Sequence, residues 1–247
     1  MEDKKLRFDI SSAGLHIIAM FCMLLDHTAA VGLIYNDWLR CIGRIAFPIF
    51  AFMTVEGFFH TKSLKKYALR LFIFALISEI PFNLMAGGGL VYPFHQNVLW
   101  TFLMALGAMW VIERAKQAKA KWLVPVAVIG VIALSYLLGV ITLADYFGGG
   151  VLTVLVFYFF REKKWYNLLA QIVALLYINV EILGGYGFEL NIFGFNFFLH
   201  MQLFALLALI PIWLYNGRKG HSSKAFKLLC YAFYPLHMLV LYLLVLL

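Results

Sequence analysis

The sequence predicts an all-α fold: a polytopic membrane bundle of about nine transmembrane helices that forms one domain over residues 1–247. Hydrophobic residues make up 64% of the chain and charged residues only 13%, against about 25% charge in an average soluble domain. The apolar residues gather in blocks of about 20, the length that a helix needs to cross a hydrocarbon core of roughly 30 Å. The alternating pattern of a membrane β-barrel is absent, so helices are the expected spanning elements.

The basic residues set the expected topology. Only Arg40 and Arg44 of the 20 Lys and Arg residues fall on one side; the others lie in the N-terminal segment (Lys4, Lys5, Arg7) and in alternate loops. Cytoplasmic loops carry the basic excess, so the N-terminus is expected in the cytoplasm and the C-terminus outside. The pair 122–141 and 145–160 is also compatible with a re-entrant hairpin. The expected spans are residues 13–35, 41–60, 67–86, 97–113, 122–141, 145–160, 165–184, 192–215 and 226–247.

Composition also excludes several function classes. The net charge is +8, and the basic residues that produce it lie between the apolar blocks, where they indicate membrane topology. No stripe of alternating basic and aromatic residues suggests a nucleic acid partner. Cys22, Cys41 and Cys230 fall in or beside spans and form no CxxC pair. No cysteine or histidine cluster has the spacing of metal ligands, so no metal is expected.

Several polar side chains are expected inside spans, where a charged group costs about 2.5–3.5 kcal/mol on insertion scales. Asp26 and His27 interrupt the apolar stretch MFCMLLDHTAAVGLIY. Neighbouring helical residues point about 100° apart, so the two cannot satisfy each other and each needs a partner on another helix. The expected topology brings them into an outward-facing candidate site with Arg44, Glu79, Gln96, Asn97, His200 and His237.

A second polar set is expected near the cytoplasmic side. His16 lies eleven residues before His27, about three helical turns, so both point to nearly the same face. Glu56 and His60 are four residues apart and share a face. Together with the basic residues that follow, the two sets could line one path through the protein. The additional basic members are Lys65, Lys66 and Arg70.

Each of these residues also has a purely structural interpretation. Arg44 paired with Asp26 or Glu79 would be an ordinary interhelical ion pair. Glu56 with His60 would be a polar pair at a helix end. His200 alone would be an interhelical hydrogen bond, and the basic loops would only fix topology.

Several stretches together resemble the TraX family of bacterial membrane proteins, whose namesake is implicated in N-acetylating pilin subunits during conjugation. These stretches cover the full length in family order: MLLDHTAAVG, CIGRIAFPIFAFMTVEGFFHT, KKYALRLFIFALISEIPFNL, QNVLWTF and YAFYPLHMLVLYLL. TraX proteins also look related to membrane acyltransferases that move acetyl groups from cytoplasmic acetyl-CoA to envelope acceptors. The resemblance therefore implies a multi-pass protein of the bacterial cytoplasmic (inner) membrane.

The resemblance also implies roles for particular residues. In the acyltransferase superfamily a basic residue of the first span precedes an essential His by eleven positions. His27 matches that His, and the basic position falls on His16, where Lys or Arg would be expected. The polar positions of the quoted motifs are Arg44, Glu56, Glu79, Gln96, Asn97 and His237.

The first functional hypothesis is transmembrane acetyl transfer. Lys65, Lys66 and Arg70 would attract acetyl-CoA from the cytoplasm, and its arm would reach along His16, Glu56 and His60. His27 would act as general base on an amine or hydroxyl from outside. Asp26 or Glu79 would orient the imidazole, and Arg44 or an amide such as Asn97 would bind the acceptor or the oxyanion. Gln96 and His237 complete the substrate side; the acceptor would be a pilin-like peptide, a glycan or a lipid.

The alternative hypothesis is a proton-coupled transporter or exporter, because intramembrane Asp, Glu, Arg and His residues also form proton relays. The sequence shows no inverted repeat and no paired broken helices, which are the usual signs of a transporter. Nine spans also fit an inverted duplication poorly. The enzyme hypothesis is therefore preferred.

Overall fold

The computed structural model describes residues 9–221 and 223–247, so the predicted basic residues Lys4, Lys5 and Arg7 lie outside the described residues. The described chain is mostly helical and contains one two-stranded sheet. Its first half forms α1 (Ser12–Ala30), α2 (Asp37–Gly43), α3 (Ala46–His60), α4 (Leu64–Gly87) and α5 (Val98–Gln117).

The second half continues with helices and then a hairpin. Helix α8 runs into a π-helical turn, η1, and the 3₁₀ helix η2 runs into α9. The elements are α6 (Leu123–Ile141), α7 (Phe147–Phe159), α8 (Trp165–Tyr177), η1 (Ile178–Ile182), β1 (Gly187–Ile192), β2 (Phe195–His200), η2 (Met201–Ala208), α9 (Leu209–Leu214) and α10 (Lys224–Val245).

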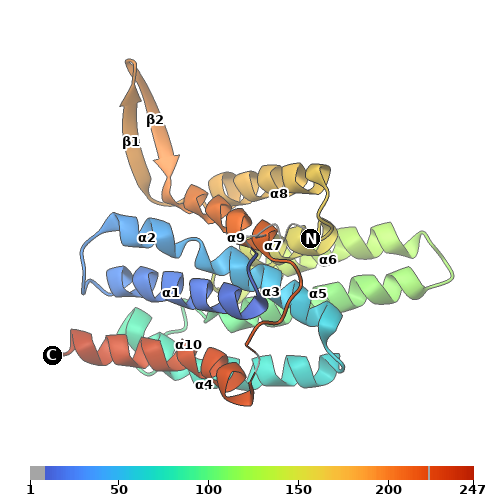
Figure 1. Ribbon diagram of the computed structural model, residues 1–247, viewed down its shortest axis with the longest axis horizontal. Coiled ribbons are helices and arrows are strands. Elements are labelled where there is room, and N and C mark those ends of the chain that lie inside the picture. The colour runs from blue at the N-terminus through green and yellow to red at the C-terminus, as the bar shows by residue number, and fades with distance from the viewer. Residues whose placement is uncertain (1–8, 222) are drawn as a thin grey trace, which may run out of the picture.

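Seven helices of the described chain are long and apolar enough to cross a membrane, which makes this a multi-pass membrane protein by helix length and composition. Two of the nine expected spans are shorter apolar helices, Phe147–Phe159 and Met201–Leu214. The connections α1–α2 and η1–β1 lie toward one end of the bundle, whereas α3–α4, α5–α6 and α7–α8 lie toward the other (Figure 1). The membrane side that each end faces stays a prediction.

The expected span 192–215 is wrong in its first nine residues, because residues 192–200 belong to a β-hairpin. Strands β1 and β2 pair antiparallel around a two-residue loop, Phe193–Gly194. Both loop residues have positive φ, 54° and 85°, as a type I′ turn requires. Open strand edges leave backbone groups unpaired, so a two-stranded hairpin cannot lie in the hydrocarbon core. The alternation in FELNI and the following Phe–Gly pair were the sequence signals for it.

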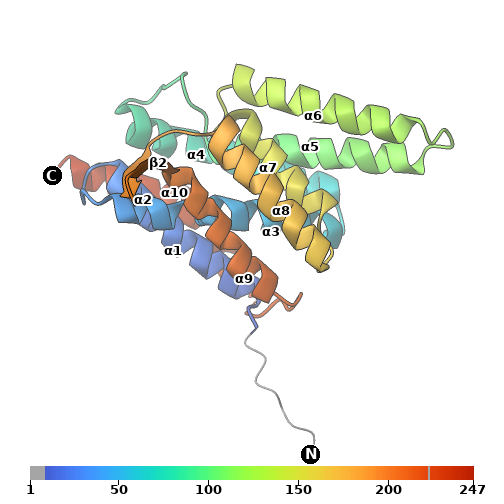
Figure 2. The ribbon, with the colours of Figure 1, turned by 90° about the horizontal axis from the view of Figure 1, so that it is seen from above.

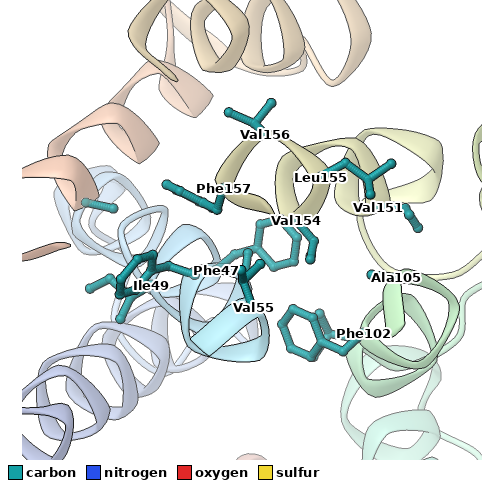
Figure 3. Packing of buried hydrophobic residues seen from close by; sticks show 14 of the residues in the cluster. Phe47, Ile49, Val55, Phe102, Ala105, Val151, Val154, Leu155, Val156 and Phe157 are labelled. Carbon is teal, nitrogen blue, oxygen red and sulfur yellow. The ribbon is translucent and has the colours of Figure 1, made fainter. Parts of the chain in front are cut away.

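Helix α7 lies at the centre of the bundle although it is one of the two short helices. Ten of its 13 residues are buried. Figure 3 shows Val154 of α7 beside Phe47 of α3 and above Phe102 of α5, with Val151 on the side of Ala105 and Phe157 on the side of Ile49. A helix that is apolar and covered all round belongs to an interior rather than to the lipid-facing surface.

Candidate functional site

The two histidines in the outer part of the predicted site form a hydrogen-bonded pair. His27 lies in the last turn of α1, and its Nδ1 is 2.8 Å from Nε2 of His237 in α10. The planes of the two rings are nearly parallel, with 17° between them. Nδ1 of His237 lies 2.7 Å from the carbonyl oxygen of Phe233. We call His27 and His237 the histidine pair.

The contacts of the histidine pair fix which nitrogens carry protons. A carbonyl oxygen only accepts, so His237 must donate from Nδ1 to Phe233. Nε2 of a neutral His237 is then an acceptor, and His27 must donate to it from Nδ1. Nε2 of His27 is left with a free lone pair and bonds to none of the described residues. The orienting partner of His27 is thus a histidine, rather than the carboxylate of Asp26 or Glu79 that the sequence suggests.

Asp26, the neighbour of His27, is buried and faces two arginines. Its two carboxylate oxygens each accept from Nη2 of Arg44 at 2.6 Å, and Oδ1 is 2.9 Å from Nη1 of Arg40. Gly43 makes this approach possible, because a Cβ there would overlap the Asp26 side chain. Asp26 and His27 therefore each find their own partner on another element, as the sequence predicts.

Every guanidinium nitrogen of Arg44 has a partner inside the protein. Besides Asp26, its Nη1 donates to Oε1 of Gln202 at 3.2 Å and its Nε donates to the carbonyl of Arg40 at 3.3 Å. Arg40 differs, because among the described residues only its Nη1 is engaged, by Asp26. Arg40 also borders a hollow of about 230 Å³ that is further lined by Ala29, Tyr35, Asn36 and Asp37.

A carboxylate cluster lies on α4 and α5. Oε2 of Glu79 accepts from Nε1 of Trp100 at 2.9 Å and from Nδ2 of Asn97. Asn97 also caps α5 and donates to the carbonyl of Ala75 at 2.9 Å. The other Glu79 oxygen, Oε1, is buried and has no partner among the described residues. We call Glu79, Asn97 and Trp100 the carboxylate cluster.

Helix α10 joins the two groups. The backbone N–H of Val98, next to Asn97, donates to the hydroxyl of Tyr234 at 3.4 Å. The rings of Tyr234 and His237 are 6.0 Å apart between centroids. In α10, Pro235 stands between Tyr234 and His237 in the sequence, and in α4, Pro81 follows Glu79 by two residues. A proline inside a helix removes one backbone hydrogen bond, so each of these two helices loses one beside its site residue.

The loop that precedes α5 is tied to the connection between α6 and α7. Nε2 of His95 lies 3.1 Å from Oδ1 of Asp145, and Gln96 exchanges backbone hydrogen bonds with Leu143 and Asp145. The hydrogen bond to Asp145 raises the pKa of His95 above its usual value, against the opposing effect of burial. Gln96 also lines a hollow of about 340 Å³ with Trp100, Met104 and Thr142, beside the carboxylate cluster.

The predicted cytoplasmic set is only partly brought together. Glu56 accepts from Nε of Arg161 at 2.7 Å, and its other oxygen is 3.8 Å from Nδ1 of His60. His16 instead lies near Phe226 of α10, with ring centroids 6.4 Å apart, and bonds to the carbonyl of Ser12. The remaining members, Lys65, Lys66 and Arg70, are exposed in the first two turns of α4.

The chain is similar to known proteins over nearly its whole length. The family model described as TraX protein matches residues 11–245. The chain belongs to the TraX family. A protein described as probable fimbrial assembly protein FimC, serogroup H1, from Dichelobacter nodosus is 29% identical over 249 residues. The match covers 94% of this chain and 95% of that protein. No solved structure gives a significant match.

Several polar residues of this TraX-family chain were missed by the sequence reasoning. Arg40 was treated only as a loop residue, although it precedes Arg44 by four positions and so shares its face. Asp145 and Arg161 lie in short connections, where nothing in the sequence specified their partners. His200, expected to be hydrogen-bonded between helices, instead lies on β2 with Nδ1 buried and unpartnered among the described residues. No group of three His, Cys, Asp or Glu in the described part could hold a metal ion.

Proposed function

We propose that the protein is a membrane acetyltransferase that moves an acetyl group from cytoplasmic acetyl-CoA to an acceptor outside the bacterial cytoplasmic membrane. The observation that carries the proposal is the free Nε2 lone pair of His27, fixed by the chain of donors through His237. A neutral imidazole with one defined tautomer presents a basic nitrogen that can take a proton from an attacking group. Membership of the TraX family supports the same activity.

In the proposed reaction the nitrogen or oxygen of the acceptor attacks the thioester carbonyl. His27 Nε2 takes the proton of the acceptor, the C–S bond breaks, and the thiolate of coenzyme A leaves. The proton then passes from His27 to the thiolate, so that the free thiol is released and the imidazole is neutral again. The reaction requires no covalent enzyme intermediate.

Arg40 is a better candidate than Arg44 for the developing oxyanion. The sequence suggested Arg44, but each of its nitrogens already bonds inside the protein. Arg40 keeps donors free and borders the hollow beside the last turn of α1. Asp26 would then hold both guanidinium groups in place and offset part of their positive charge, which otherwise opposes a cation at His27.

The carboxylate cluster is the proposed contact for the acceptor. A buried carboxylate oxygen without a donor is costly, and a bound N–H or O–H group would satisfy it. Glu79 Oε1 is such an atom, and Trp100, which donates to the other Glu79 oxygen, lines the hollow together with Gln96. Because the Dichelobacter relative is described as a fimbrial assembly protein, we propose a fimbrial or pilin-like peptide as the acceptor, with glycan and lipid as the other options.

The donor is proposed to enter from the end where α4 begins. Lys65, Lys66 and Arg70 are exposed there and can attract the phosphates of coenzyme A. Glu56 and His60, with Arg161, lie at the same end as the paired polar groups along which the arm of the donor would pass. His16 lies in the first two turns of α1, where it contacts Phe226 of α10 and not these groups.

The test is acetyl transfer by the purified full-length protein in lipid vesicles. Wild type and a His27→Ala variant are compared using acetyl-labelled coenzyme A and envelope extract as acceptor, with mass spectrometry of the products. His221→Ala, which removes an exposed loop histidine, is the matched control. We expect transfer by wild type and His221→Ala and loss in His27→Ala at unchanged abundance. Retained transfer in His27→Ala, or pH-driven solute flux without any acetyl transfer, contradicts the proposal.

A further inference from the structure

The hairpin formed by β1 and β2 has two chemically different faces. Successive strand residues point to opposite sides, and paired residues share a side. The register pairs Phe188 with Leu199 and Leu190 with Phe197, and Phe195 continues this row. These described side chains of one face are all apolar. The opposite face carries the pairs Gly187–His200, Glu189–Phe198 and Asn191–Asn196.

The hairpin projects sideways from the bundle. It runs across the direction of α1 and α10 in Figure 1, and Figure 2 shows it nearly end-on. For helices that cross a membrane, this direction is the membrane plane. The base of the hairpin is close to α2, where Phe188 stacks on Trp38 with ring centroids 6.0 Å apart. The apolar face therefore continues into aromatic side chains at the end of the bundle.

Water alone is a poor surrounding for this element. Phe193 is 97% exposed, Phe195 69% and Phe197 54%. A single two-stranded hairpin is at best marginally stable in water and needs a surface to pack on. Its open edges equally exclude the hydrocarbon core, where unpaired backbone groups find no partner.

The boundary between headgroups and acyl chains satisfies both requirements. Headgroups and water can bond the strand edges while the apolar face enters the acyl boundary. Aromatic side chains concentrate at this depth in membrane proteins. Residues 186–200 contain no Lys or Arg, and their one charge, Glu189, lies on the polar face.

We propose that the hairpin of β1 and β2 is an interfacial membrane element: its apolar face, with Phe195 and Phe197, lies in the lipid interface at the end of the bundle where α1 ends. The occupant of this face is phospholipid. This inference does not depend on the acetyltransferase proposal, because it concerns only the geometry and side-chain pattern of the hairpin.

The test places a photo-crosslinking p-benzoylphenylalanine at position 197, or at the matched control position 196 on the opposite face. Full-length protein is reconstituted in phosphatidylethanolamine and phosphatidylglycerol vesicles and irradiated, and the hairpin peptides are analysed by mass spectrometry. A second pair, positions 195 and 191, repeats the comparison. Only protein that is monodisperse in size-exclusion chromatography is scored, so that misfolded variants do not contribute.

We expect several-fold more phospholipid adduct at 197 than at 196, and the same excess at 195 over 191. Three outcomes would overturn the proposal. They are equal lipid adducts on both faces, a predominant adduct to protein at 197, and the absence of lipid adducts at 197 while the same probe at Leu236 or Val240, two exposed apolar positions of α10, reacts with lipid. All three outcomes are measured by crosslinking, so they are independent of the result of the acetyl transfer assay.

Discussion

At the scale of single residues, the neighbours Asp26 and His27 are separated into two different tasks. Asp26 pairs with two arginines, whereas His27 belongs to a donor chain that ends on the carbonyl of Phe233. The sequence predicted that both residues need partners elsewhere, because adjacent helical positions diverge by about 100°. It could not identify those partners, because His237 is 210 positions away from His27 and only the packing of α1 against α10 brings them together.

The histidine pair makes a testable distinction between two substitutions. His237→Leu removes the acceptor for Nδ1–H of His27, whereas His237→Gln can replace it with an amide oxygen. We expect acetyl transfer to fall about 100-fold in His237→Leu, since a misplaced general base loses most of its contribution of roughly 10²–10⁴. His237→Gln should retain much of the rate. Initial rates with labelled acetyl-CoA measure the activity of both variants. An equal loss in the two variants would contradict the proposed role of the hydrogen bond from His27 to His237.

His95 gives a pH-dependent prediction. The hydrogen bond to Asp145 raises its pKa, so the charged form is stabilised in the folded protein. This stabilisation is complete below the unfolded pKa of about 6.5 and is lost as the pH rises through the higher folded pKa. His95→Gln should therefore lower the Tm in detergent most near pH 6, and the difference from wild type should shrink toward pH 8.

The size of this His95 effect should be small, about 0.2–1 kcal/mol, because the pair is about one third exposed and solvent screens it. His221→Gln is the control, since His221 lies in an exposed loop and contacts Ser223. A Tm difference that grows with pH would show that the neutral ring of His95 is the stabilised form.

At the scale of elements, the close approach of α1 and α2 depends on one glycine. A Cβ at Gly43 would overlap Asp26. Gly43→Ala is therefore expected to destabilise the protein by about 1–3 kcal/mol through overpacking, and to lower acetyl transfer because Asp26 and Arg44 must shift. Unfolding in detergent, followed by circular dichroism, measures the first effect.

Gly107→Ala in α5 is the matched control for Gly43→Ala. Nothing lies within 4 Å of a Cβ at Gly107, so alanine meets no neighbour there. Replacing a helical glycine by alanine is expected to stabilise by about 0.5–1 kcal/mol through helix propensity. If both variants behaved alike, space at the contact with Asp26 would not be the reason for Gly43.

Elements differed in how well the sequence predicted them. The long apolar helices followed directly from hydropathy, as in the spans 67–86 and 97–113, which lie within or nearly within α4 and α5. The hairpin was missed because the stretch 192–215 is largely apolar, and an average over it conceals the strand β2 at its beginning. Local turn chemistry at Phe193–Gly194 decided the structure there.

At the scale of the whole molecule, the expected topology can be tested by the sides on which two loops lie. Lys119→Cys marks the connection between α5 and α6, and Glu189→Cys marks β1. Three helical passes, α6, α7 and α8, separate them, so they should face opposite sides. Membrane-impermeant maleimide is expected to label Glu189→Cys on intact bacterial cells and Lys119→Cys only after permeabilisation.

The wild-type protein is the background control for this labelling, because Cys22 and Cys41 are buried and Cys230 is half-buried. Labelling of both new cysteines from the same side would contradict the alternation, because an even number of crossings would then separate the two positions. A re-entrant hairpin of 122–141 and 145–160 would leave one crossing, α8, and so the same opposite labelling as three crossings. The asymmetry of Lys and Arg predicted the alternation, but the sequence could not show that α7 is buried among its neighbours.

The shortness of α7 has a further consequence. At 1.5 Å per residue its 13 residues are about 20 Å long, a third less than a hydrocarbon core of roughly 30 Å. Because protein surrounds this helix, the lipid bilayer does not need to thin to match its length. The two ends of α7 are therefore expected to lie deeper than the membrane surfaces. One such end adjoins Asp145 and His95. An acetyl donor and an acceptor that approach α7 from opposite sides of the membrane would thus be separated by less than the thickness of the surrounding bilayer.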